Sequence, residues 1–180
     1  MQKIKYISAP NFVDIKDNEN VVFLAGPIQG ALGWHEEAHK IFIEEYNKLD
    51  TDLQITIFSP KRETGIEKNF TQYDVQVEWE TLYLKKSGEQ GVVLFWFANE
   101  KEKVYLKDGS LRPFGKTSRS EYGEWKARHD ILGCDVVLGL DTDWQKEKYF
   151  RTRIEQDGSD IPICSTLRET IQETLNKIIK

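Results

Sequence analysis

Five short apolar runs recur along the chain, separated by longer and more polar stretches. They are VVFLA (21–25), ITIF (55–58), VVLFWF (92–97), VVLGL (136–140) and IPIC (161–164). Within these runs the apolar residues follow one another without alternating with polar ones, which is typical of strands that are covered on both faces. The runs therefore predict five strands of a buried sheet.

The stretches between the runs show the three- and four-residue spacing of amphipathic helices. The apolar positions are Trp34, Ala38, Ile41, Phe42 and Tyr46 in the first gap, Val75, Trp79 and Leu82 in the second, and Leu167, Ile171, Leu175 and Ile178 after the last run. Alternating strands and helices predict a doubly wound α/β domain over residues 21–180, with a parallel sheet of about five strands in the order 2-1-3-4-5. Residues 1–20 form a polar leader with no assigned structure.

In such a sheet the ligand crevice opens where the winding direction reverses, between the loops that follow strands one and three. The first of these loops is GPIQGALG (26–33), and the second is long for a strand-to-helix connection. Within it, residues 101–116 are an insertion, and VYLKDGSLRP predicts a hairpin that turns at Asp108–Gly109. Long loops at this edge often act as lids, and we expect the same of this hairpin.

Composition narrows the class of ligand and the compartment. The 180 residues carry a net charge of −5 without a Lys/Arg cluster between aromatics, which disfavours a nucleic-acid polymer and favours a small molecule. We see neither the apolar run of a signal peptide nor a stretch long enough to cross a membrane, so we expect a cytoplasmic protein without a membrane partner. Cys134 and Cys164 lack CxxC spacing and are expected to be reduced core thiols.

Two motifs suggest chemistry that their surroundings do not support. H-E-x-x-H at residues 35–39 is the signature of zinc peptidases, but the usual downstream spacings provide no third ligand. We interpret these histidines as part of a solvated helix face and expect no metal. GKT at 115–117 lacks the glycine that a phosphate-binding loop needs five positions earlier, and GPIQG is not a dinucleotide fingerprint. No cofactor is therefore predicted.

The stretch TSRSEYGEW (117–125) has two interpretations. Ser118 and Glu121 have the spacing of a capping box, in which Glu121 only satisfies a backbone N–H. The same helix start lies at the predicted crevice, where an ionised Glu121 could attack a sugar carbon. Glycosyl transfer also needs a proton donor, and Glu80 on the preceding helix could serve, or could be an ordinary solvated carboxylate. Trp79 beside it is core or a platform for a base, and its apolar row with Val75 and Leu82 favours the core.

Taken together, these segments resemble the nucleoside 2-deoxyribosyltransferase family, in its nucleoside 2-deoxyribosyltransferase-like branch. The similar pieces are FLAGPI (23–28), Trp34, SPKR (59–62), QVEWE (76–80), LFWF (94–97), SEYGEW (120–125), VVLGLD (136–141) and STLRETI (165–171). The resemblance implies a flavodoxin-like sheet and cleavage of the bond between a base and 2'-deoxyribose, with transfer to another base or to water. It implies that Glu121 is the nucleophile, that Glu80 is linked to protonation of the base, and that the sites belong to homo-oligomers.

The substrate is then a nucleoside or nucleotide, together with a free nucleobase. The residues that we expect to contact it are Gly26, Pro27, Ile28, Asp74, Gln76, Trp79, Trp96, Asn99 and Ser118. An alternative is a non-catalytic nucleotide-sensing module on the same fold. An aspartate that precedes the nucleophile in the better-studied branch has no counterpart in PFGKTSR (113–119), which supports the alternative, whereas the intact Glu121 within SEYGE supports the enzyme.

Overall fold

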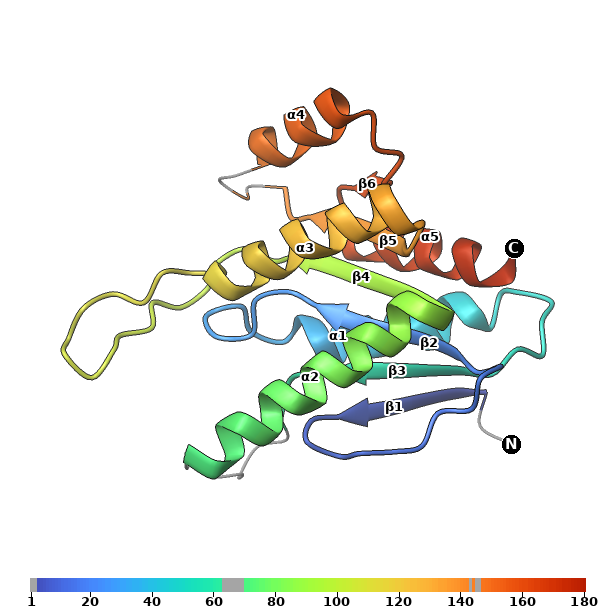
Figure 1. Ribbon diagram of the computed structural model, residues 1–180, viewed down its shortest axis with the longest axis horizontal. Helices are drawn as coiled ribbons and strands as arrows, with labels where there is room; N and C mark the ends of the chain where they lie inside the picture. The colour runs from blue at the N-terminus through green and yellow to red at the C-terminus, as the bar shows by residue number, and fades with distance from the viewer. Residues whose placement is uncertain (1–2, 63–69, 143, 145–146) are drawn as a thin grey trace.

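The computed structural model describes residues 3–62, 70–142, 144 and 147–180. Its elements are β1 (Ile4–Ser8), β2 (Asn20–Ala25), α1 (Trp34–Tyr46), β3 (Ile55–Ser59), α2 (Phe70–Gln90), β4 (Gly91–Phe97), α3 (Lys116–Leu132), β5 (Asp135–Leu140), α4 (Glu147–Asp157), β6 (Ile163–Cys164) and α5 (Leu167–Ile179). The strands form one parallel sheet in the order β1-β3-β2-β4-β5-β6. Figure 1 shows this sheet between two layers of helices.

The predicted flavodoxin-like order is confirmed for the five expected strands. If β2 is counted as the first, the order β3-β2-β4-β5-β6 is 2-1-3-4-5. Two details differ from the expectation. The leader contributes a sixth strand, because β1 pairs with β3 from Ile4–Ile55 to Ser8–Ser59. The last strand is shorter than its apolar run, since β6 comprises only Ile163 and Cys164.

Each face of the sheet has its own core. The strand β4 illustrates the division: Val93, Phe95 and Phe97 belong to the cluster on the side of α2, α3 and α4, whereas Leu94 and Trp96 belong to the cluster on the side of α1 and α5. The strand residues are continuous in hydrophobicity because both sets of alternating side chains are buried. In the described part of the chain, no helix combines the length and the apolar character that crossing a membrane requires.

The apolar row predicted for the second helix is wrong in part. Trp79 is fully buried, but Val75 and Leu82 are 38% and 39% exposed. The buried stripe of α2 instead passes through Trp79, Tyr83 and Ser87, which are spaced by four residues. Val75 and Leu82 lie at the rim of this stripe, since they are rotated away from Tyr83 around the helix axis.

Candidate active site

The glycine loop that follows β2 lies tightly against the end of β4. Gly26 has a φ of 152°, and a Cβ at this position would lie 2.2 Å from the carbonyl oxygen of Trp96. Only glycine allows this close approach of two backbones. The Trp34 Nε1 at the start of α1 donates a 2.7 Å hydrogen bond to the carbonyl oxygen of Pro27, which fixes the path of the loop. The loop thus lies beside the carboxyl end of β4, where the winding direction reverses.

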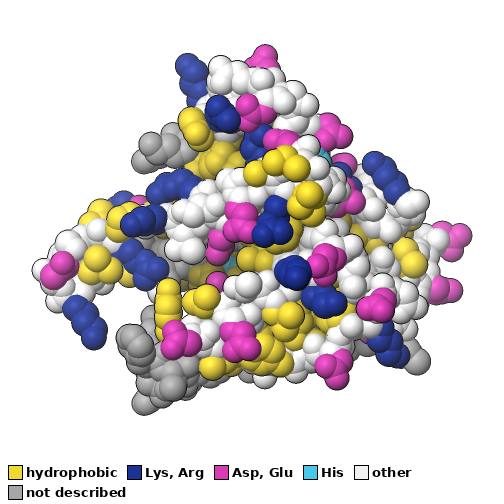
Figure 2. All heavy atoms as spheres, in the orientation of Figure 1, with side chains coloured by type: hydrophobic (Ala, Val, Ile, Leu, Met, Phe, Trp, Pro, Cys, Tyr) yellow, Lys and Arg dark blue, Asp and Glu magenta, His cyan; other side chains and the backbone are white. Residues whose placement is uncertain are grey.

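The predicted hairpin within residues 101–116 is confirmed. Tyr105 and Leu111 form an antiparallel bridge, and Gly109 adopts a φ of 80° at the turn. The base of the hairpin is attached to the glycine loop, since the carbonyl oxygen of Gly30 accepts hydrogen bonds from the backbone N–H groups of Lys101 (2.7 Å) and Glu102 (3.2 Å). The hairpin projects from the body of the molecule (Figures 1 and 2). Its action as a lid stays a prediction.

The capping-box interpretation of Ser118 and Glu121 is wrong. The helix α3 begins at Lys116, after Gly115, whose left-handed φ of 60° starts the helix without a side-chain cap. Glu121 therefore lies in the second turn, too far along the helix to bond a free backbone N–H at its start. A capping role therefore does not explain why residue 121 is a glutamate.

Glu121 on α3 and Glu80 on α2 are both half-buried, and the charge of Glu80 acts on Glu121. Burial, with smaller contributions from the charges of Glu80 and Glu124, raises the pKa of Glu121 to about 7. Burial also raises the pKa of Glu80, although a hydrogen bond from Gln76 and the positive charge of Arg62 oppose this rise. Two such carboxyl groups do not ionise independently, because each charge disfavours the other. With a pKa of about 7, Glu121 is partly protonated at neutral pH.

A chain of hydrogen bonds orients Glu80. The Gln76 Nε2 donates to the Glu80 Oε1 (2.6 Å) and to the carbonyl oxygen of Pro60 (2.8 Å). The Arg62 Nε donates to the Gln76 Oε1 at 2.7 Å. Gln76 and Glu80 lie four residues apart on one side of α2, so that the helix presents both to the loop that follows β3. The loop and the helix together hold one oxygen of Glu80 in a fixed direction.

Several other predicted substrate contacts lie at the same edge of the sheet. Gly26 and Pro27 are buried, Ile28 is half-buried, and Ser118 is buried in the first turn of α3. Asn99 follows β4, and its backbone N–H donates to the Asp141 Oδ2 at 3.2 Å. All of these residues except Ser118 belong to the loops that follow β2 and β4, and Ser118 lies in the helix that the second loop leads into, as expected for a site at the point where the winding reverses.

Three predicted contacts are placed elsewhere. Trp79 lies in the core and donates from Nε1 to the carbonyl oxygen of Asn11 (2.8 Å), which agrees with the interpretation that the sequence favoured. Trp96 is buried on the opposite face of the sheet, in the cluster of α1 and α5. Asp74 is exposed on α2, and its side chain leaves the helix about 160° away from that of Gln76, since successive residues differ by about 100°. Substrate contact is therefore expected less at these three residues than at the others.

The histidines of H-E-x-x-H are not on a solvated face. His35 is only 1% exposed, and its ring lies 3.7 Å from that of Trp34 between centroids. Burial and the charge of Lys61 lower the pKa of His35 to about 3. His39 is half-buried and stacks on Tyr6 at 4.3 Å. Within the described ranges, no three His, Cys, Asp or Glu side chains are grouped so that they could hold a metal ion.

The family to which the chain belongs follows from a comparison with known protein families. A family model described as "Nucleoside 2-deoxyribosyltransferase like" matches residues 19–135. The chain belongs to this family. The matched segment begins just before β2 and ends with the first residue of β5, and it includes Glu80, Glu121 and the glycine loop. No curated protein matches the chain.

One polar residue of the family segment has a position that sequence reasoning did not assign to the site. Arg62 ends the SPKR stretch, which supported the resemblance without a role for its side chain. In the structure it bonds Gln76 and its charge acts on Glu80. The available signal was a cation in the loop that follows a buried strand, at the carboxyl edge of the sheet.

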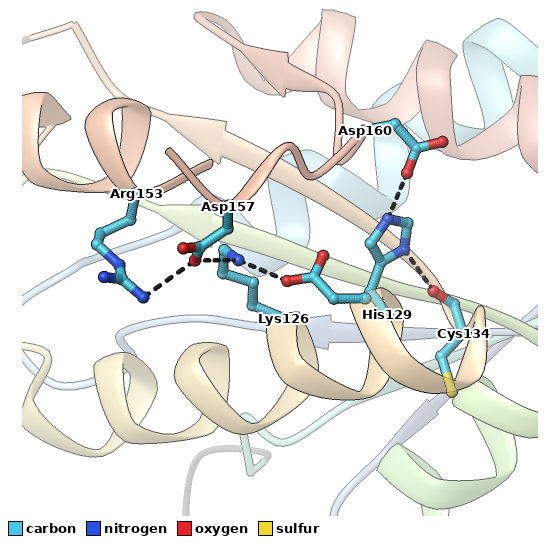
Figure 3. A network of polar contacts seen from close by, with 7 residues as sticks. Lys126, His129, Cys134, Arg153, Asp157 and Asp160 are labelled. Atoms are coloured by element: carbon cyan, nitrogen blue, oxygen red, sulfur yellow. Dashed lines mark hydrogen bonds and ion pairs between the residues drawn. The ribbon is translucent and has the colours of Figure 1, made fainter. Parts of the chain in front are cut away.

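A second polar network attaches α3 to the elements that follow it (Figure 3). The Lys126 Nζ, on a side chain that is 11% exposed, donates to the Asp130 Oδ2 (2.6 Å) and to the Asp157 Oδ2 at the end of α4 (2.7 Å). Arg153 also bonds Asp157 at 3.0 Å. The imidazole of His129 contacts the carbonyl oxygen of Cys134 and the carboxylate of Asp160. The helix that carries Glu121 is thus attached to α4 and to the segment before β6.

Proposed function

We propose that this protein cleaves the N-glycosidic bond of 2'-deoxynucleosides or their nucleotides and transfers the deoxyribosyl group to another base or to water. In this proposal Glu121 is the nucleophile and Glu80 handles the proton of the departing base. The observation that carries it is the pair of half-buried carboxyl groups: the pKa of Glu121 is raised to about 7, the charge of Glu80 contributes to that rise, and burial raises the pKa of Glu80 as well. Family membership supports the same class of reaction.

A singly protonated pair has the two groups that a double displacement needs: one carboxylate to attack and one carboxylic acid to protonate the leaving group. In the protein without substrate, the hydrogen bond from Gln76 and the charge of Arg62 favour an ionised Glu80, which places the proton on Glu121. Attack requires the proton to move to Glu80. The positive charge that develops at C1' favours this shift, because it stabilises an anionic Glu121 most in the transition state.

The proposed reaction consists of two displacements at C1'. A carboxylate oxygen of Glu121 forms a bond to C1' while the bond between C1' and the base nitrogen breaks, and its electron pair stays with the base. Protonated Glu80 supplies a proton to the base. In the second step an incoming base nitrogen or a water oxygen attacks C1', Glu80 takes the proton of this acceptor, and Glu121 is released as a carboxylate. Two inversions at C1' give net retention.

The test uses Glu121→Gln, with Glu124→Gln as the matched control because Glu124 is exposed on the same helix. Purified variants are incubated with nucleosides and 5'-nucleotides, with and without a second free base, and base release is followed by chromatography. We expect Glu121→Gln to lower cleavage by several orders of magnitude, since an amide does not attack C1', and Glu124→Gln to change it little.

Trapping identifies the nucleophile directly. A 2-fluoro sugar analogue should leave a covalent adduct on Glu121, which peptide mass spectrometry locates, and a transferred β-nucleoside should remain β. An adduct on another residue, or an active Glu121→Gln protein, would refute the assigned role. If the wild-type protein binds nucleotides with micromolar affinity and cleaves none of them, the nucleotide-sensing module becomes the better account.

A further inference from the structure

The hairpin presents an apolar pair to solvent. Tyr105 and Leu111 face each other across it, and the bonds from Leu106 N to Ser110 O and from Arg112 N to Val104 O lie on either side. This pattern defines a non-hydrogen-bonded pair, in which the two side chains are close and share one face of the hairpin. Tyr105 is nevertheless 65% exposed and Leu111 49% exposed. An isolated two-stranded hairpin is marginally stable in water, so a covering surface would stabilise this one.

The charge of the hairpin is opposite to that of the rest of the chain. Residues 101–116 contain five Lys or Arg and two Asp or Glu, a net charge of +3, whereas the whole chain carries −5, so the remaining residues carry −8. Lys107 and Arg112 flank the apolar pair, and neither forms an ion pair with a carboxylate in the described part of the chain. The hairpin therefore fits an apolar surface that is bordered by carboxylates.

The outward side of α2 has that character. Asp74 and Glu78 lie four residues apart, both are exposed, and neither pairs with a cation among the residues that the structure describes. Val77 is 43% exposed on one side of this acidic ridge, and Val75 and Leu82 are 38% and 39% exposed on the other. The ridge is distinct from the inward side, where Gln76 and Glu80 form their hydrogen bond.

We propose that the hairpin of one copy of this protein docks on the acidic ridge of α2 in a second copy, and that the two copies exchange hairpins around a twofold axis. Figure 1 shows the hairpin and the amino-terminal end of α2 at the same end of the molecule, with the hairpin standing off from its own body. In a twofold dimer the same contact occurs twice, which doubles the buried area. Each hairpin then lies along α2 of the other copy. It contacts the side of this helix that faces away from the hydrogen bond between Gln76 and Glu80.

The experiment measures the dimer dissociation constant of the full chain by analytical ultracentrifugation at several salt concentrations. The arm variant is Lys107→Glu/Arg112→Glu, the ridge variant is Asp74→Lys/Glu78→Lys, and the control is Lys16→Glu/Lys148→Glu, which changes exposed lysines elsewhere. Circular dichroism confirms that each variant is folded. We expect a wild-type dimer whose dissociation constant rises with salt, an increase of at least tenfold in the arm variant and in the ridge variant, and little change in the control.

Mixing provides the decisive comparison. In an equimolar mixture, the reversed arm of one variant meets an oppositely charged ridge on the other, so both contacts of a heterodimer are complementary. We expect the mixture to dimerise at least tenfold more tightly than the arm variant alone. A wild-type protein that stays monomeric, or a dimer that is indifferent to both charge reversals, would overturn the proposal. If shortening the hairpin alters turnover while the oligomeric state is unchanged, the hairpin is a lid over its own site instead.

Discussion

Replacing Glu121 by glutamine should stabilise the fold, and the gain should depend on pH. Burial, with the charges of Glu80 and Glu124, raises the pKa of Glu121 from 4.5 to about 7. A group whose pKa is raised by folding binds its proton more tightly in the folded state, so stability is lost as pH rises from 4.5 through 7. At 1.36 kcal/mol for each pKa unit, the loss is about 3 kcal/mol, and about 2 kcal/mol after allowance for partial exposure.

Glutamine has nearly the same shape and does not ionise. The difference in unfolding free energy between Glu121→Gln and the wild type should therefore be small at pH 4.5 and should grow to about 2–3 kcal/mol in favour of the variant at pH 8. Urea denaturation at several pH values measures this difference, because all other titrating groups except Glu80 contribute equally to both proteins. Glu124→Gln, on the exposed side of the helix, should show much smaller growth, because it removes only the smallest of the three contributions to the raised pKa of Glu121. A constant difference across this pH range would refute the claim that the site holds Glu121 at an energetic cost.

Two further predictions concern the surroundings of the site. Trp79→Ala should lower the free energy of unfolding by about 3–5 kcal/mol and Trp79→Phe by less, because Trp79 fills the core. If the variants are as stable as the wild type but bind substrate less well, Trp79 is instead a platform for the base. Burial lowers the pKa of His35 to about 3, so folding loses stability as pH falls from 6.5 towards 3, and His35→Phe should reduce that acid sensitivity in denaturation curves. If the stability of His35→Phe falls with decreasing pH as steeply as that of the wild type, the imidazole is solvated in the folded protein.

The fold could be predicted from the sequence because its signals are local. Both faces of the strands are buried, so runs such as VVLFWF have no polar interruption, and parallel strands joined by helices admit few orders. The strand β1 was missed because IKYIS is an edge strand with polar residues in a polar leader. Its register depends on β3, which lies about fifty residues further along the chain, and no local pattern encodes that distance.

The site was only partly predictable for the same reason. The sequence indicated Glu121 and Glu80, and the charge of Glu80 contributes to the raised pKa of Glu121. The spacing of Ser118 and Glu121 suggested a cap because the left-handed conformation of Gly115, which starts α3 earlier, is not visible as a pattern. The relay from Arg62 through Gln76 depends on how α2 packs against the loop after β3, and that packing is a tertiary property.

The network around Lys126 shows that the family segment and the part of the chain that packs together with α3 end at different residues. The family segment ends at residue 135, yet α3 is completed by α4, through the bond of Lys126 to Asp157 and through the ring of Tyr122, which packs edge-on against Phe150 with centroids 4.8 Å apart. A fragment cut at the end of the family segment would contain both glutamates and leave a lysine amine and an aromatic ring without their partners. Inheritance of the chemistry and autonomy of folding thus have different limits in this chain, and sequence variation beyond residue 135 could change the direction of Glu121 without altering any residue of the proposed site.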